Sequence, residues 1–172
     1  VGESGCGKST LALATMGLLT GRSRVGGSIT FDGQELVGLP EKQRRKLRGD
    51  RMAMVFQDPL TSLDPTYGIG EQVAEAIRAH RDVTKSEARE RALELLKDVG
   101  IPAAERRYDE PPHRLSGGMR QRVVVAAAVA NDPSLLIADE PSTALDVTIQ
   151  AQILELLLAM RELHGTAIML IT

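Results

Sequence analysis

The first ten residues place the tightest constraint on this chain. Residues 2–9, GESGCGKS, follow the pattern of a phosphate-binding loop: glycine, four residues, then glycine, lysine and a hydroxyl residue. Glycines let backbone N–H groups turn toward phosphate oxygens, Lys8 brings a positive charge to the β- and γ-phosphates, and the Ser9 hydroxyl suits Mg²⁺. The pattern therefore predicts a site for a nucleoside triphosphate. The expected nucleotide-binding residues are Gly2, Glu3, Ser4, Gly5, Cys6, Gly7, Lys8, Ser9 and Thr10.

Composition narrows the class of protein further. With 172 residues, 42% of them hydrophobic and 26% charged, the chain is expected to form one globular domain with an inserted lobe. A net charge of -2 gives no overall basic excess of the kind that favours nucleic-acid binding. The single cysteine, Cys6, excludes an internal disulfide and a zinc cluster of cysteines, which indicates a reducing compartment such as the cytoplasm. The longest strictly apolar run, Val123–Ala130, is far too short to span a membrane.

Hydrophobic patterning predicts an α/β fold. Residues 10–19 have helical spacing, and residues 27–36 alternate around Asp32-Gly33 as in an antiparallel hairpin. Apolar runs at 52–56, 135–138 and 167–171 are separated by helical patterns, which is typical of a parallel sheet covered on both faces. The charged stretch between the first two runs is expected to form an inserted helical lobe, with a capping box at Thr84 and Glu87.

Two carboxylates directly follow the second apolar run. In LLIADEP, residues 135–141, Asp139 and Glu140 fall at the carboxyl end of the expected strand, where open α/β sheets bind their ligands. We expect Asp139 to hold Mg²⁺ and Glu140 to orient or deprotonate the water that attacks the γ-phosphate. Gln57 ends the first run, so its amide oxygen should emerge at the same edge, where it can contact Mg²⁺ or that water. The pattern favours ATP hydrolysis.

A second glycine-opened helix start lies at LSGGMRQR, residues 115–122. Ser116, Gly117 and Gly118 precede an apolar helix expected to run to about Asn131, where Asp132-Pro133 ends it. The residues alone favour an ordinary serine N-cap for Ser116, while the glycines and the free helix start are also suited to an anion. Both interpretations stay open on local sequence.

The order of these motifs resembles that of ATP-binding-cassette ATPases. The phosphate loop, Gln57, LSGG at 115–118, LLIADEP and STALD at 142–146 follow one another as in that family. The stretches VFQDPLTSLDP, PPHRLSGGMRQR and ADEPSTALDVTIQAQI resemble the ATPase subunits of bacterial oligopeptide and dipeptide importers in particular. That branch uses LSGGM in place of LSGGQ, so Met119 does not count against function.

The resemblance implies a P-loop NTPase (RecA-like) core with an inserted α-helical subdomain and a small antiparallel β element. It divides the chain into residues 1–57 and 119–172, forming the nucleotide-binding core, and residues 58–118, forming the helical subdomain. It makes Gln57 and Glu140 the catalytic pair, and it gives Mg²⁺ the ligands Ser9, Gln57 and Asp139. It assigns Ser116, Gly117 and Gly118 to the ATP bound by the opposing subunit, and Asp146 to a dimer-contact loop.

The partners implied are a second ATPase subunit, identical or paralogous, and membrane permease subunits, with the ATPase peripheral on the cytoplasmic face of the cell membrane. The family's adenine-stacking aromatic residue, its switch histidine and the branch's C-terminal extension have no counterpart in residues 1–172, so both ends are expected to be cut and the piece alone nearly inactive.

Three alternatives remain at this stage. Nickel, glutathione and sugar importers have similar ATPase subunits. A DNA-repair or chromosome clamp shares the same head, but Gln57 and Ser116 are too close in sequence for its long coiled-coil insertion. A GTPase is disfavoured because the guanine-reading Asn-Lys-x-Asp motif is absent from the sequence.

Overall fold

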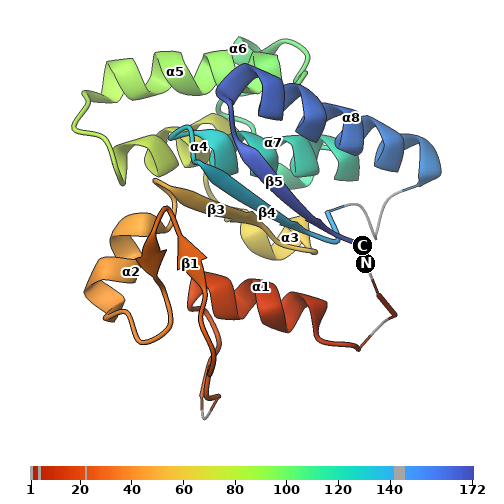
Figure 1. Cartoon of the computed structure of the whole chain (residues 1–172). Helices are drawn as coiled ribbons and strands as arrows, with labels where there is room; N and C mark the ends of the chain where they lie inside the picture. Colours follow the sequence, from red (N-terminus) through yellow and green to blue (C-terminus); the bar gives the residue numbers. More distant parts are fainter. Residues whose placement is uncertain (1, 4, 22, 142–145) are drawn as a thin grey trace.

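The computed structural model describes residues 2–3, 5–21, 23–141 and 146–172, with only the backbone of Pro59 and Leu60. Helices separate the strands of a parallel sheet, as predicted for an α/β chain (Figure 1). In chain order the elements are α1 (Lys8–Met16), β1 (Thr30–Phe31), β2 (Gln34–Glu35), α2 (Glu41–Leu47), β3 (Met52–Val55), α3 (Pro59–Ser62), α4 (Ile69–Arg78), α5 (Lys85–Asp98), α6 (Ala104–Arg107), the 3₁₀ helix η1 (Pro112–Arg114), α7 (Gly117–Val129), β4 (Leu135–Asp139), α8 (Val147–His164) and β5 (Ala167–Ile171).

Within the described residues, a parallel sheet runs in the order β3-β4-β5. Its register pairs Met52 with Leu135 and Asp139 with Ile171. The predicted apolar runs are therefore the strands, and the carboxyl ends of all of them lie at one edge. The connection from β3 to β4 contains α3 to α7, so the inserted helical lobe lies where the sequence predicted it.

Side chains alternate between the two faces of the sheet because a strand has a period of two. On β4, Leu136 and Ala138 pack into the larger core with α7 and α8, whereas Ile137 packs with Ala12 and Met16 of α1. Figure 1 shows α1 on one side of the sheet and α7 and α8 on the other. Both faces of β4 are thus covered, which accounts for its nearly continuous apolar character.

The inserted lobe contains α4 and α5, which pack against each other and against α7. The predicted capping box is present at the start of α5: Thr84 Oγ1 accepts the Glu87 N–H at 3.2 Å, and Glu87 Oε2 accepts the Thr84 N–H at 2.7 Å. This reciprocal pair satisfies two backbone donors that a helix start leaves without partners. Among the described residues, no helix combines the length and the apolar character needed to cross a membrane.

The ends of two elements differ from the sequence prediction. The helix expected over residues 10–19 begins at Lys8 and ends at Met16, because Gly17 adopts a left-handed φ of 66°. The Gly17 and Leu18 N–H groups then donate to the carbonyls of Ala14 and Leu13, closing the helix three residues earlier than its apolar pattern suggested. Likewise α7 ends at Val129, short of Asn131.

The small antiparallel hairpin of β1 and β2 turns at Asp32 and Gly33, whose φ values of 48° and 77° are those of a primed turn. Beside it, the Glu35 carboxylate accepts hydrogen bonds from the Ser28 hydroxyl and from the N–H groups of Ile29, at 2.9 Å, and Val37, at 2.7 Å. These donors favour the ionised form and lower the pKa of Glu35 to about 2, from 4.5.

We expect this hairpin to loosen in acid. Because the pKa of Glu35 is lower in the folded state, its contribution is complete above the unfolded value of 4.5 and is lost as the pH falls toward about 2. NMR shifts of the Ile29 and Val37 amides should follow that titration, and Glu35→Gln should remove it. Amide shifts that titrate identically in the Glu35→Gln protein would show that another group is responsible.

Candidate nucleotide-binding site

The start of α1 presents free backbone donors to solvent. Gly7 precedes the helix with a left-handed φ of 95°, and no side-chain cap of the first turn is found among the described residues. The turn also lacks an acidic residue. A helix N-terminus without a capping side chain carries partial positive charge on unpaired N–H groups. The loop geometry therefore suits a phosphate group, as residues 2–9 predicted.

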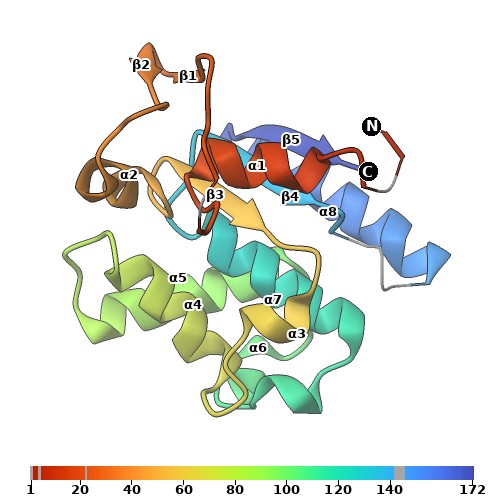
Figure 2. The same cartoon turned by 90° about the horizontal axis from the view of Figure 1, so that it is seen from below.

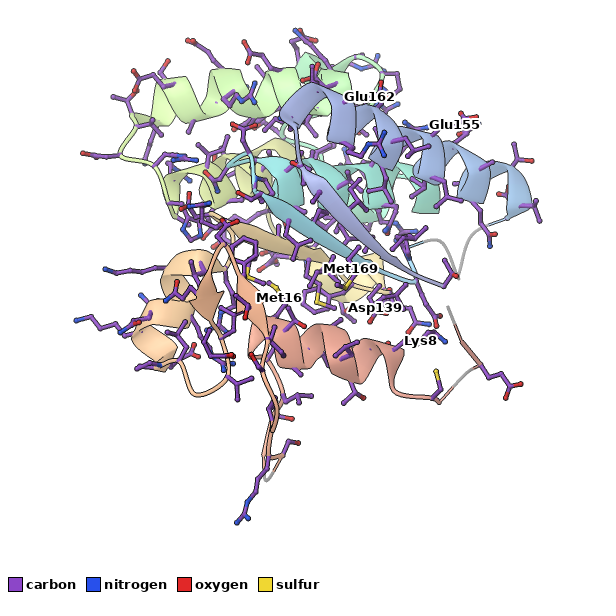
Figure 3. All side chains as sticks on the ribbon, in the orientation of Figure 1. Lys8, Met16, Asp139, Glu155, Glu162 and Met169 are labelled. Carbon is purple, nitrogen blue, oxygen red and sulfur yellow. The ribbon has the colours of Figure 1, made fainter. Side chains whose placement is uncertain are left out.

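Lys8 folds back over its own loop. Its Nζ donates to the carbonyls of Gly2, at 2.6 Å, and Glu3, at 3.1 Å, and lies 4.0 Å from Glu140 Oε1. Figure 3 shows Lys8 and Asp139 on the same side of the molecule, at the carboxyl edge of the sheet. The ammonium group thus lies between the phosphate loop and the acidic end of β4.

Ser9 and Asp139 are brought together across the interior. Ser9 Oγ donates to Asp139 Oδ1 at 3.0 Å, although the two residues are 130 positions apart. Asp139 is only 5% exposed and ends β4 beside Ile171 of β5. A hydroxyl and a carboxylate oxygen in contact are hard oxygen donors of the kind that Mg²⁺ prefers.

Glu140 and Gln57 also meet, from the ends of neighbouring strands. Gln57 Nε2 donates to Glu140 Oε2 at 3.0 Å. Glu140 has a φ of 45°, rare for a residue with a side chain, and its N–H donates to Ile171 O at 3.0 Å. This left-handed backbone turns the chain sharply after β4, and such strained conformations cluster at functional sites.

The donor set fits Mg²⁺ bound together with a nucleotide better than a metal held by protein alone. Among the described residues, no group of three or more His, Cys, Asp or Glu side chains could hold a metal ion. Mg²⁺ commonly keeps several waters and uses one or two carboxylates with substrate phosphates. Ser9 and Asp139 could supply such a partial shell, and Gln57 lies at the same sheet edge, hydrogen-bonded to Glu140.

The LSGG segment lies on a different element, at the start of α7. Ser116 caps this helix by accepting the Met119 N–H at 3.3 Å, so the N-cap interpretation accounts for its contacts within one chain. A Cβ on Gly118 would lie 2.9 Å from Ile149 Cγ2 of α8, which explains one of the two glycines by packing. No described contact joins Ser116 to the phosphate loop of its own chain.

Part of the predicted site falls outside the described residues. Ser4 of the phosphate loop and residues 142–145 of the STALD stretch belong to this part. Asp146, which follows directly, caps α8 by accepting the Ile149 N–H at 3.0 Å. This cap lies within one chain, and the role of Asp146 in a dimer contact stays a prediction.

One buried polar residue that joins the turn before β3 to the helical lobe was missed from sequence. Asn131 is 2% exposed, and its Nδ2 donates to Gly49 O, at 3.1 Å, and to Ala76 O, at 2.9 Å. It therefore links the turn before β3 to α4. The only sequence signal was a polar residue after a long apolar helix, which we took as a helix end.

The fold and the site together define a nucleotide-binding cassette. A model of the ABC transporter family matches residues 1–143. The chain belongs to this family, and the predicted fold class is confirmed. The ATP-binding cassette MJ0796, solved as a dimer in a post-hydrolysis state bound to ADP and Pi, has the same fold: the TM-score is 0.82 at 31% identity, over 99% of this chain and 71% of that one.

Among individual relatives, the chain is 55% identical over 173 residues to the dipeptide transport ATP-binding protein DppD of Escherichia coli K12. It is 54% identical over 174 residues to the probable peptide ABC transporter ATP-binding protein y4tR of Sinorhizobium fredii. Each alignment covers 100% of this chain but only 53% and 52% of the relatives. The chain thus spans about half the length of the curated relatives it matches.

Proposed function

We propose that the protein is the ATP-hydrolysing subunit of a bacterial importer of dipeptides or oligopeptides. The observation that carries this proposal is the meeting of Lys8, Gln57 and Glu140 with the Ser9–Asp139 pair at one sheet edge. The assignment to a peptide importer is supported by 54% and 55% sequence identity to proteins that are named as peptide and dipeptide transport ATP-binding proteins.

Each side chain has a distinct role in the proposed reaction. The α1 N-terminus and Lys8 bind the phosphates, and Ser9, Asp139 and Gln57 would hold Mg²⁺. Bound Mg²⁺ would neutralise charge on the β- and γ-phosphates. Glu140 accepts a proton from the attacking water or orients it, and Gln57, already hydrogen-bonded to Glu140, positions that carboxylate.

The domain boundaries follow from the same proposal. Residues 1–57 and 119–172 form the nucleotide-binding core, and residues 58–118 form the helical subdomain. Between them lies a largely apolar cavity of about 690 Å³, lined by Met54 of β3, Phe56, and parts of α4 and α7. Phe56 is 40% exposed and adjoins Gln57. We assign this groove to a segment of a membrane permease subunit, which would bring the protein to the cytoplasmic face of the membrane.

A second ATPase subunit completes the proposed site. Ser116, Gly117 and Gly118 would contact the γ-phosphate of ATP bound to the partner's phosphate loop, and Asp146 would lie in the dimer contact. Support comes from the start of α1, where Gly7 provides no side-chain cap, from the glycine-opened start of α7, and from the dimeric state of the solved relative. Such a sandwich makes hydrolysis depend on dimer formation.

The transport proposal is tested on the complete transporter in vesicles, with its permeases and solute-binding protein. Dipeptides or oligopeptides should stimulate ATP hydrolysis and accumulate inside, whereas nickel, glutathione and sugars should not. Stimulation by one of those other solutes would move the protein to a different importer branch. Association of the protein with DNA in place of permeases would favour the alternative of a DNA-repair or chromosome clamp.

The dimer proposal predicts complementation between two inactive variants. Ser116→Asp keeps a good N-cap but places a negative charge against the phosphate, and Lys8→Ala disables the phosphate loop. In the complete protein, each variant alone should lose about 100-fold in ATP hydrolysis. Mixed dimers contain one intact composite site, so mixing should restore activity. Mixtures that form dimers and stay inactive would contradict a site shared between subunits.

A further inference from the structure

Basic side chains are concentrated in one short segment of this chain. Residues 41–51, which form α2 and the turn into β3, hold six basic and two acidic residues. The rest of the chain holds fifteen basic and twenty-one acidic residues. A chain that is acidic overall therefore presents a local basic surface, and such segregation of charge is typical of contact with an anionic partner.

Some of these charges are neutralised locally. Arg48 pairs with Glu41 across one side of α2, and Arg51 pairs with Asp32 of the hairpin. Arg44 donates to the carbonyls of Leu36 and Leu39, without a carboxylate partner.

Three cations on α2 have no such partners. Lys42, Arg45 and Lys46 are exposed, and no ion pair joins them to any carboxylate in the described part of the chain. Arg45 and Lys46 lie in the last turn of α2, next to each other. Their charge is thus available to a ligand.

Arg45 and Lys46 border a hollow of about 390 Å³, whose other lining residues are Arg48, Ala79 and His80. No carboxylate lines it within the described residues. Guanidinium groups bind phosphate through paired N–H donors, and an ammonium group adds a point charge. The hollow therefore has the donors of a phosphate site. None of its lining residues belongs to the phosphate loop, which precedes α1.

This hollow adjoins the groove assigned above to the permease. The two share Arg48, Ala79 and His80, so they open on neighbouring parts of one surface. Figure 2 shows α2 beside β3, on the same side of the molecule as the loop that joins α4 to α5. A permease segment seated in the groove would bring the basic hollow close to the bilayer.

We propose that α2, through Arg45, Lys46 and the adjoining hollow, binds the phosphate groups of anionic phospholipids at the membrane surface. The inference rests on the proposed function, because that function places the membrane next to the groove. Binding would hold the ATPase at the bilayer in addition to its permease contact.

The test is sedimentation of the complete protein with vesicles, without permease or nucleotide. Vesicles of phosphatidylcholine containing phosphatidylglycerol should bind the protein, and vesicles of phosphatidylcholine alone should not. Each cation near an anionic surface strengthens binding about five-fold, so Arg45→Gln/Lys46→Gln should weaken it about twenty-five-fold. Raising the salt concentration should weaken wild-type binding as well.

A matched control carries the same loss of charge elsewhere. Arg24→Gln/Arg106→Gln neutralises two exposed arginines for which no ion pair is found in the described part of the chain, one in the loop before β1 and one on α6. Its vesicle binding should stay within about two-fold of wild type. An equal loss in both double variants would overturn the proposal, because net charge alone would then explain binding. Displacement by millimolar inorganic phosphate, with direct phosphate binding at α2 in NMR, would identify a soluble anion and overturn it too.

ATP hydrolysis by the same variants, measured without lipid, separates this inference from the function on which it rests. No contact joins Arg45 or Lys46 to the described residues of the phosphate loop, so turnover should match wild type. Normal turnover with no selectivity for anionic vesicles would refute the lipid site alone. Vesicle binding without any ATP hydrolysis by the wild type would refute the proposed enzyme.

Discussion

Replacing Glu140 with glutamine is expected to lower ATP hydrolysis by about 100- to 10,000-fold, the usual contribution of a general base. Glutamine keeps the size of the side chain and its place beside Gln57, whose Nε2 lies 3.0 Å from Glu140 Oε2. It removes the carboxylate that would accept the proton of water. ATP affinity should be maintained, because the proposed site assigns the phosphate contacts to Lys8 and the α1 N-terminus. Single-turnover phosphate release and nucleotide binding by the complete protein measure the two effects.

A control tests whether the loss is specific to this carboxylate. Glu155 is exposed on α8, away from the sheet edge that carries Lys8 and Asp139 (Figure 3). Glu155→Gln therefore makes the same chemical change at a distant position and should leave turnover unchanged. If Glu140→Gln hydrolyses ATP at the wild-type rate, the role assigned to Glu140 is wrong.

The largest expected effect on stability comes from Gly70→Ala. Gly70 is the second residue of α4, and a Cβ there would lie 2.0 Å from Cδ2 of Tyr108. The Tyr108 ring is 1% exposed and lies 3.8 Å from the Arg89 guanidinium, so it has little room to move. Such overpacking should lower the free energy of unfolding by up to about 3 kcal/mol. Urea denaturation followed by circular dichroism measures the change.

Two further variants make that result specific. Gly26→Ala introduces the same methyl group where no atom lies within 4 Å, and it should change stability by less than about 0.5 kcal/mol. Tyr108→Ala removes Cγ, Cδ2 and Cε2, the atoms that the new methyl group would strike. Combined with Gly70→Ala, it should cost clearly less than the sum of the two single changes. Strictly additive costs would mean that the contact between Gly70 and Tyr108 is not the cause.

Most of the secondary structure could be predicted from local sequence, because its signals are local. The Thr84–Glu87 capping box, the Asp32-Gly33 turn and the apolar strands all appear where expected. Helix ends were less accurate, as at α1, because the apolar pattern of residues 10–19 continues past Gly17. A left-handed glycine ends a helix even where the hydrophobic periodicity does not stop.

The types of residue at the site were also predictable, because the phosphate-loop pattern and the acidic pair after a buried strand are short sequence patterns that each indicate their chemistry. Their mutual contacts were not. The hydrogen bond from Ser9 to Asp139 spans 130 positions, and that from Gln57 to Glu140 spans 83. Whether Lys8 faces phosphate or its own loop carbonyls likewise depends on backbone conformation.

The sequence by itself determined the family, the α/β class and the residues that bind and cleave a nucleotide in the proposed reaction. Only the tertiary structure decided that Asn131 links the turn before β3 to α4, that Gly70 lies against Tyr108, and that Arg45 and Lys46 border a hollow beside an apolar groove. The physical reason is range. Turn chemistry and periodicity act over a few residues, whereas these contacts depend on the register and packing of elements far apart in the chain.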